Sequence, residues 1–135
     1  GTYVHFNHKV ASLVEIAGAS GGEVGALARE SAEHVTAGVP RVPGAASRED
    51  VPAAFVASER AIFEAQAKES GKPEAIVQKM VDGRVAKLYG EIVLVEQPWV
   101  RDDSKTIQQR VDEVAKSVGA KLPVRRFVRF QMGGE

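Results

Sequence analysis

Two long amphipathic segments separated by a four-residue turn constrain the fold of this chain more than any other feature. The first begins after Pro52 and runs to the turn Ser70-Gly71-Lys72-Pro73. The second continues towards Pro98, with apolar residues three and four apart. Glycine permits a left-handed helix cap and proline suits the first turn of a new helix, so the turn breaks the helix sharply. Two such helices must pack antiparallel, which predicts a projecting helical hairpin at about 52–97.

Both ends of the chain have the character of β-strands. Tyr3-Val4-His5-Phe6 is short and rich in aromatic and β-branched residues, and Lys9–Ala17 alternates between two faces. The short turn between them, in which Asn7 is the residue suited to a positive φ, predicts a β-hairpin. Val124–Met132 alternates without interruption. We expect this last strand to join the hairpin in a small antiparallel sheet.

Two further helices complete the predicted architecture. The range from Glu23 to about Ala37 carries an apolar stripe and ends at Gly38. A last helix begins near Ser104 and ends at Gly119, and residues 39–51 are expected to form a surface loop. Together these elements predict an α+β fold in which helices pack on one side of the sheet.

The composition excludes several classes of protein and site. A chain of 135 residues fits a single domain over 1–135. Lys plus Arg and Asp plus Glu both number 18, so the net charge offers no general attraction for nucleic acid. Cysteine is absent, which removes disulfides, a thiol nucleophile and thiolate metal ligands. No apolar run approaches the ~20 residues that a membrane-spanning helix needs. Because the sequence opens directly on strand-like residues, we expect it to be part of a longer protein.

Few side chains are arranged for catalysis or for a cofactor. His5 and His8 flank the hairpin turn, while His34 lies late in the first helix and is expected to be a partly buried helix residue. No third ligand or nucleophile stands at a suitable spacing. The loop Ser20–Gly25 lacks the first glycine of the pattern G-x-G-x-x-G, and Gly71-Lys72-Pro73 lacks the serine or threonine of a phosphate loop. We expect no metal, no cofactor and no enzymatic activity.

The last strand supports a second hypothesis. Arg125–Phe130 interleaves cations with aromatic rings, which is how some sheets hold single-stranded RNA. An ordinary strand with one solvated face would have the same pattern. The chain could therefore be an RNA-binding or ribosome-associated module, although the zero net charge makes nucleic acid the less favoured partner.

The projecting helical hairpin points instead to a protein partner. A long exposed hairpin contributes little to the core of its own domain, and such projections usually serve contact with another protein. A third hypothesis is a structural dimerisation domain, since an exposed sheet edge can pair with a second copy and give a homodimer.

Several segments resemble the elongation factor Ts family, and the likeness covers nearly the whole chain. The most specific stretch runs from the Gly-Lys-Pro-Glu turn to Glu-Gln-Pro. The segments that carry the resemblance are Tyr3-Val4-His5, Lys9-Val10, Leu13-Val14-Glu15, Ser58-Glu59-Arg60, Ser70-Gly71-Lys72-Pro73-Glu74, Ile76-Val77, Lys79-Met80-Val81, Gly83-Arg84, Leu94-Val95-Glu96-Gln97-Pro98, Lys105-Thr106 and Arg126-Phe127-Val128-Arg129-Phe130.

The resemblance implies a guanine-nucleotide exchange factor for elongation factor Tu, acting in the cytoplasm or inside an organelle. In the family, the core sheet and the hairpin turn contact Tu, and a histidine of the hairpin takes part; by its match this is His5. The coiled coil is a further contact arm. The partner-binding residues that we predict are His5, Phe6, Asn7, His8, Ser70, Gly71, Lys72 and Pro73.

Two departures from the family pattern affect the expected activity. The Thr-Asp-Phe motif that should follow the second strand is missing, because Glu15 continues into Ile16-Ala17-Gly18-Ala19-Ser20. The family's small N-terminal helical domain is also missing. Both gaps fit the C-terminal half of a factor Ts whose core is duplicated. We therefore expect the chain to bind Tu and, alone, to exchange nucleotide poorly.

Overall fold

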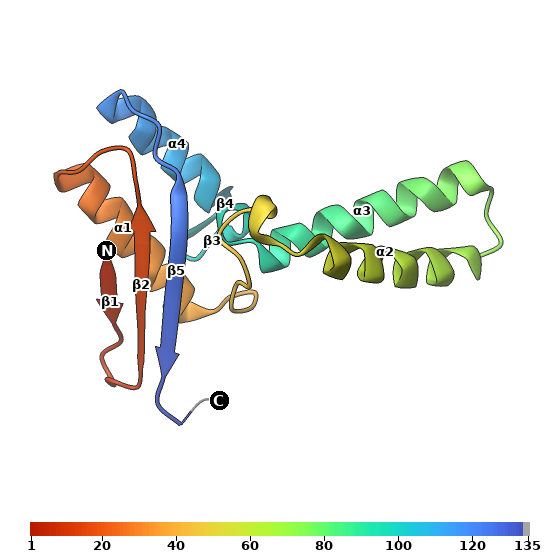
Figure 1. The fold of residues 1–135 in the computed structure, drawn as a ribbon, viewed down its shortest axis with the longest axis horizontal. Helices are drawn as coiled ribbons and strands as arrows, with labels where there is room; N and C mark the ends of the chain where they lie inside the picture. The colour runs from red at the N-terminus through yellow and green to blue at the C-terminus, as the bar shows by residue number, and fades with distance from the viewer. Residues whose placement is uncertain (134–135) are drawn as a thin grey trace.

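A three-stranded antiparallel sheet forms one layer of the molecule in the computed structural model, which describes residues 1–133. The strands are β1 (Thr2–Val4), β2 (Val10–Ile16) and β5 (Val124–Gln131), in the order β1-β2-β5. Figure 1 shows that the last strand lies beside the N-terminal hairpin, which confirms the predicted sheet. Residues 134–135 of the predicted domain lie outside the described range.

Helices α1 (Gly22–Ala37) and α4 (Ile107–Val118) cover one face of this sheet (Figure 1). The core lies between these layers and is built from apolar residues that the helical stripes and the strand alternation supply. The α+β prediction is therefore confirmed. The buried residues of this main core are Val14, Val24, Leu27, Ala32, Val35, Ala46, Leu94, Ile107, Val111, Val114, Leu122 and Val124.

The predicted helical hairpin is present and projects from the sheet as an arm (Figure 1). Its helices are α2 (Ala53–Lys68) and α3 (Glu74–Ile92), and they pack on each other along their length. A second, separate core of Ala67, Val77 and Val81 holds them together. Among the described residues, no helix combines the length and apolar character required to cross a bilayer.

The segment between α3 and α4 differs from the prediction. The second arm helix ends at Ile92 instead of continuing to Pro98, because residues 92–95 bond to the loop at 44–46. A short hairpin of β3 (Pro98–Trp99) and β4 (Asp102–Thr106) follows. The last helix therefore begins at Ile107 and not near Ser104. Thr106 caps it through a reciprocal pair of bonds with Gln109, which satisfies two exposed helix-end donors.

The loop 39–51 was expected at the surface, and its middle is buried. Ala45 and Ala46 are only 8% and 4% exposed. The amides of Gly44 and Ala45 donate to the Ile92 carbonyl, and the amide of Leu94 donates to the Ala45 carbonyl. These backbone bonds make a parallel bridge that no local sequence pattern signals. A 3₁₀ turn, η1 (Arg48–Asp50), then leads towards the arm.

The last strand does not alternate without interruption. Its register against β2 shifts between Glu15 and Ile16, so that Arg126 pairs with Glu15 while Val124 pairs with Ile16. The unpaired residue, Arg125, forms a β-bulge, so Val124 lies in the core although Val128 lies on the outer face. Simple alternation placed both valines on the same face because it does not allow for this bulge.

Matched leucine substitutions compare the buried layer between α1 and the sheet with the outer face of the sheet. Leu27→Ala removes a side chain that is 1% exposed in the main core, so it should lower the free energy of unfolding by about 2–5 kcal/mol. Leu13→Ala alters a side chain that is 47% exposed on the outer face and should cost about 1 kcal/mol or less. Urea unfolding measures both; equal losses would contradict the layer assignment.

Candidate protein-binding surfaces

The turn between β1 and β2 is tightly organised by backbone and side-chain hydrogen bonds. The His5 amide donates to the Val10 carbonyl (2.9 Å), and the His8 amide donates to the His5 carbonyl (2.8 Å). Asn7 accepts a bond from the Lys9 amide through Oδ1. The residue with positive φ is His8 (57°) and not Asn7. The strand prediction was also too long, since β1 ends at Val4.

The Phe6 ring at this turn faces solvent. Phe6 is 82% exposed and its ring lies 4.4 Å from that of His5. His5 is half-buried, and the Tyr3 hydroxyl lies 3.4 Å from its Nδ1. His5 also borders an open hollow of about 400 Å³ between the hairpin and α1, lined in addition by Tyr3, Val10, Glu33, Thr36, Ala37 and Val100. The turn therefore offers an apolar ring beside a hollow.

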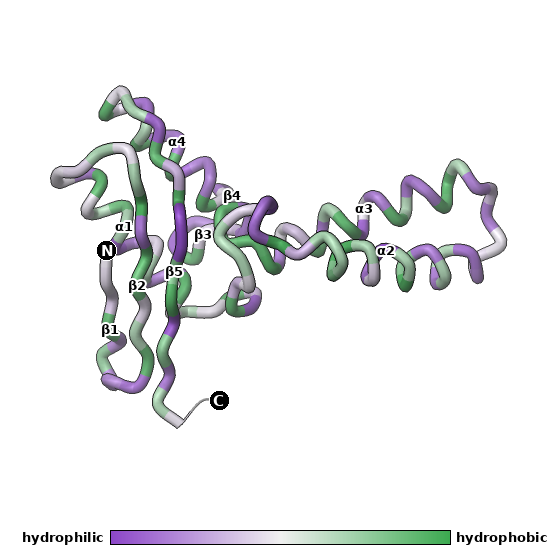
Figure 2. The backbone as a smooth tube through the Cα atoms, in the orientation of Figure 1, coloured by the Kyte–Doolittle hydropathy of each residue, from purple (hydrophilic) through white to green (hydrophobic). Residues whose placement is uncertain are grey.

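The arm tip is the second predicted contact. Ser70, Gly71, Lys72 and Pro73 are all exposed. Gly71 adopts φ 69°, a left-handed conformation that glycine accepts without steric cost, and the Ser70 hydroxyl donates to the Ala67 carbonyl (2.6 Å). Figure 2 shows hydrophilic residues spread along both arm helices up to this turn. The tip is thus a defined turn and its Lys72 side chain extends into solvent.

The structure does not bring the two predicted groups together. Figure 1 shows the β1–β2 turn at one end of the sheet and the arm tip at the far end of the projecting hairpin. They form two separate surfaces, so a partner that touches both must span the distance between them.

The outer face of the sheet is a third surface, opposite α1 and α4. Val4, Ala11 and Phe130 lie in one cross-strand row, with Leu13 and Val128 in the next. Phe130 is 65% exposed and Val4 is 56% exposed. This outer sheet face is apolar and uncovered. The alternation of residues in β2 and β5 indicated this face, although the sequence analysis named only some of its residues.

A buried polar junction was missed by sequence reasoning. His34 and Gln97 are both 0% exposed, whereas His34 was expected to be partly buried. His34 Nδ1 accepts a bond from the Val100 amide (3.0 Å), so its Nε2 carries the proton and donates to Gln97 Oε1 (2.8 Å). Gln97 Nε2 donates to the carbonyls of Arg41 (2.9 Å) and Glu91 (2.6 Å). The junction joins α1, the loop, the end of α3 and the β3–β4 hairpin.

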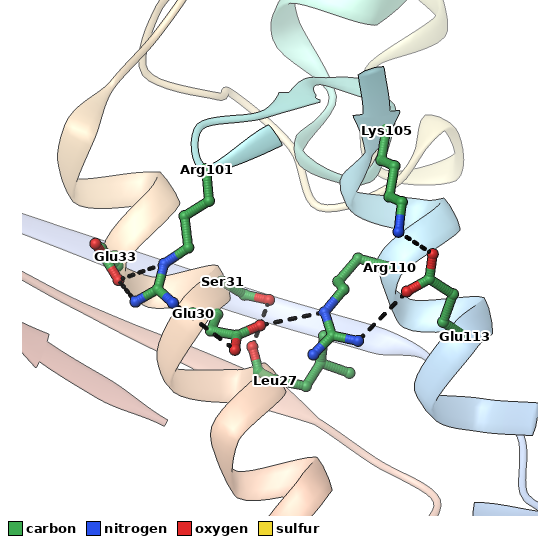
Figure 3. A network of polar contacts seen from close by, with 8 residues as sticks. All are labelled: Leu27, Glu30, Ser31, Glu33, Arg101, Lys105, Arg110 and Glu113. Atoms are coloured by element: carbon green, nitrogen blue, oxygen red, sulfur yellow. Dashed lines mark hydrogen bonds and ion pairs between the residues drawn. The ribbon is translucent and has the colours of Figure 1, made fainter. Parts of the chain in front are cut away.

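A surface network of ion pairs supports the same region from outside (Figure 3). Arg101, in the β3–β4 turn, pairs with Glu33 of α1, and Arg110 of α4 lies 3.3 Å from Glu30 of α1. Lys105 and Arg110 both approach Glu113. These contacts connect three elements, and because their side chains are partly exposed each contributes little alone.

A comparison with protein families identifies the family of the chain. The family model described as Elongation factor TS matches residues 1–134. The chain belongs to the elongation factor Ts family. This finding confirms the resemblance that the Gly-Lys-Pro-Glu turn and the Glu-Gln-Pro segment carry.

Relatives named elongation factor Ts support the assignment over almost all of the chain. The proteins of Geobacter sulfurreducens and Desulforamulus reducens are 38% and 40% identical to it; each alignment covers 98% of this chain and 62% of the relative. That of Solidesulfovibrio magneticus is 42% identical and the alignment covers 68% of its length. The chain thus spans about 62% of the first two relatives.

The buried junction predicts how stability depends on pH. Burial lowers the pKa of His34 from the ordinary value of 6.5, against a smaller opposing effect of the bond to Gln97. Below about pH 6.5 the unfolded chain binds a proton that the folded chain excludes, so the free energy of unfolding should fall as the pH decreases from 6.5 towards the folded pKa.

Urea unfolding between pH 7.5 and pH 5 measures this dependence. His34→Gln should be less stable throughout and should lose much of the slope. The matched control His8→Gln changes an exposed histidine of the turn and should keep the parent's slope. A parent slope retained in His34→Gln would show that other groups are responsible.

Proposed function

We propose that this chain binds elongation factor Tu and favours release of its guanine nucleotide. The observation that carries the proposal is the match of the Elongation factor TS model to residues 1–134, on a fold with two exposed contact elements. The activity requires no covalent chemistry. A protein that prefers the nucleotide-free form of Tu must weaken GDP binding, and GDP must weaken that protein's binding by the same factor.

We further propose that the chain acts as one domain over 1–135 and that its exchange activity alone is weak. The Thr-Asp-Phe motif is missing after β2, where Ile16 leads into Ala17-Gly18. The chain also spans about 62% of the length of the first relatives. The proposed place of action is the cytoplasm or an organelle interior.

The contact residues proposed are those of the two projecting elements. At the sheet these are His5, Phe6, Asn7 and His8, where the exposed Phe6 ring stands beside His5. At the arm tip they are Ser70 to Pro73, with Lys72 as the charged group. Two points of contact on one rigid chain raise affinity beyond that of either point, because the second contact forms within the complex.

RNA binding through β5 receives less support from the geometry. Arg126 is paired with Glu15, and Arg129 is half-buried with a bond to the Thr36 carbonyl. Phe127 packs against the main core. The cations and rings of the predicted RNA strand are therefore divided between two faces, and steep salt dependence of RNA binding would be the observation in its favour.

Titration against Tu loaded with fluorescent GDP tests the main proposal. The parent should bind Tu and release GDP slowly. His5→Ala and Lys72→Glu should each weaken binding about tenfold, the typical loss for a central contact, without a change in melting temperature. Lys79→Glu, an exposed lysine away from the tip, is the matched control and should bind like the parent. No binding by the parent at any accessible concentration would overturn the proposal.

The outer sheet face favours self-association as a second candidate function. Soluble monomers rarely leave large apolar patches uncovered, and a second copy presents the same face about a two-fold axis. The edge at β1 is less suited to pairing, since β1 has three residues, and the other edge is the longer strand β5. The proposed homodimer uses the face, because the exposed apolar side chains of Val4, Val128 and Phe130 lie there.

Sedimentation at increasing concentration measures this association. The parent should shift towards a dimer, and Phe130→Glu should remain a monomer because it places a charge among the exposed apolar side chains of the outer face. Phe55→Glu changes a phenylalanine that is 42% exposed on the arm and is the control. A concentration-independent monomer for the parent would remove this function.

A further inference from the structure

The arm is joined to the rest of the molecule by two short crossings of the chain. Val51-Pro52 leads into α2, and Ile92-Val93 leads out of α3. Beyond these crossings the two helices pack mainly on each other, as Figure 1 shows. The direction of the arm must therefore be set at this joint.

The two crossings are held differently. Val93 and Leu94 are 0% exposed and Ile92 is 7% exposed, and the backbone here bonds to Gly44 and Ala45. The exit from α3 is thus embedded in the core. The entrance to α2 lies at the surface. The embedded crossing and the Gln97 bond to the Glu91 carbonyl hold the end of α3, and a further tie from the α2 side of the joint would restrain the rotation that remains.

Arg48 supplies that tie from η1, just before α2. Its Nε and a terminal nitrogen donate to the two Glu96 carboxylate oxygens, at 2.8 and 2.7 Å. Its guanidinium also lies 4.3 Å from the centre of the Tyr89 ring. Tyr89 is in the last turn of α3, whereas Glu96 is in η2 (Leu94–Glu96) beyond the end of that helix. One side chain therefore bridges both sides of the joint.

The chemistry of arginine suits this position. Its planar fork can bind a carboxylate through two parallel bonds and stack on an aromatic ring at the same time, which lysine cannot do. The hydrogen bond to the Glu96 carboxylate is the main reason that the pKa of Arg48 is raised, so the guanidinium keeps its positive charge. The side chains of Arg48 and Glu96 are 55% and 25% exposed, so the pair contributes little to overall stability. Removal of the Arg48–Glu96 pair should change the angle between the arm and the sheet without unfolding the chain.

Small changes at the joint become large at the tip. A helix of 19 residues such as α3 is roughly 28 Å long, so a rotation of about 10° moves the tip by roughly 5 Å. That displacement exceeds the reach of a hydrogen bond. A partner that contacts both the β1–β2 turn and the tip is therefore sensitive to the angle of the arm.

We propose that Arg48, Tyr89 and Glu96 form a clamp that fixes the arm relative to the sheet, with Arg48 as a positioning residue for partner binding. The binding part rests on the proposed function; the fixed angle does not. Without the clamp the arm samples several directions, and the affinity of a two-point partner falls by the fraction of molecules in the competent direction.

Spin-label distance measurements test the angle without any partner. The chain has no cysteine, so Ala26→Cys on α1 and Ala75→Cys near the tip give two defined label positions, both exposed. The parent should give one narrow distance distribution. Arg48→Gln should broaden it about twofold or more, because the fork and the charge are lost. An unchanged width would overturn the proposal.

Matched variants separate the clamp from general disturbance. Tyr89→Leu removes the ring face and should broaden the distribution, whereas Tyr89→Phe keeps the ring and should not. Arg60→Gln breaks an exposed pair with Asp82 (2.7 Å) inside the arm and should leave the width unchanged. Equal broadening by Arg60→Gln or Tyr89→Phe would contradict the assignment.

Binding to Tu supplies the second readout. Arg48→Gln should weaken binding about fivefold, and Lys72→Glu should cost less in the Arg48→Gln background than in the parent, because the tip is no longer held in place. Additive losses would overturn the positioning role. Absence of binding by the parent would refute the proposed function and would leave the distance result to decide the clamp.

Discussion

The hydrogen bond between His34 and Gln97 is the interaction on which the arrangement of the other elements depends. It joins residues 63 positions apart in a region from which water is excluded. Each partner satisfies a backbone group of another segment, at Val100, Arg41 and Glu91. A buried polar group that loses its partner costs more than the bond contributes when made, so the four segments are held in one arrangement. The sheet, the arm and the β3–β4 hairpin are positioned around this point.

Around that junction the molecule divides its tasks. The sheet and its two helices supply a rigid body, while the arm presents a turn at a distance from it. The candidate surfaces lie on parts that the main core does not need: the exposed Phe6 ring, the tip at Lys72 and the outer sheet face. This separation is what allows a contact residue to change without loss of the fold.

Elements governed by local chemistry could be predicted from the sequence. The arm followed from helical spacing and from the Gly71-Lys72-Pro73 turn, and the sheet followed from alternation in β2 and β5. The tip and hairpin-turn residues were located in the same way, because turn chemistry is read from neighbours along the chain. Whether these residues contact a partner remains a prediction.

Features made by distant segments could not be predicted. The burial of Ala45 depends on Ile92 and Leu94, and the bulge before Phe127 depends on how β5 meets β2. His34 carried no local signal for a partner as remote as Gln97, and Arg48 carried none for Glu96. Long-range pairs of this kind require the fold to be known first.

The separate core of the arm has a consequence for the way the molecule comes apart. Ala67, Val77 and Val81 make no common cluster with the main core, so little apolar area links the cohesion of the hairpin to that of the sheet. Parts of a protein joined by so few buried contacts open independently. The two arm helices can therefore open from the tip inward while the strands stay paired. The least free energy is needed to open the turn at Ser70 and Gly71.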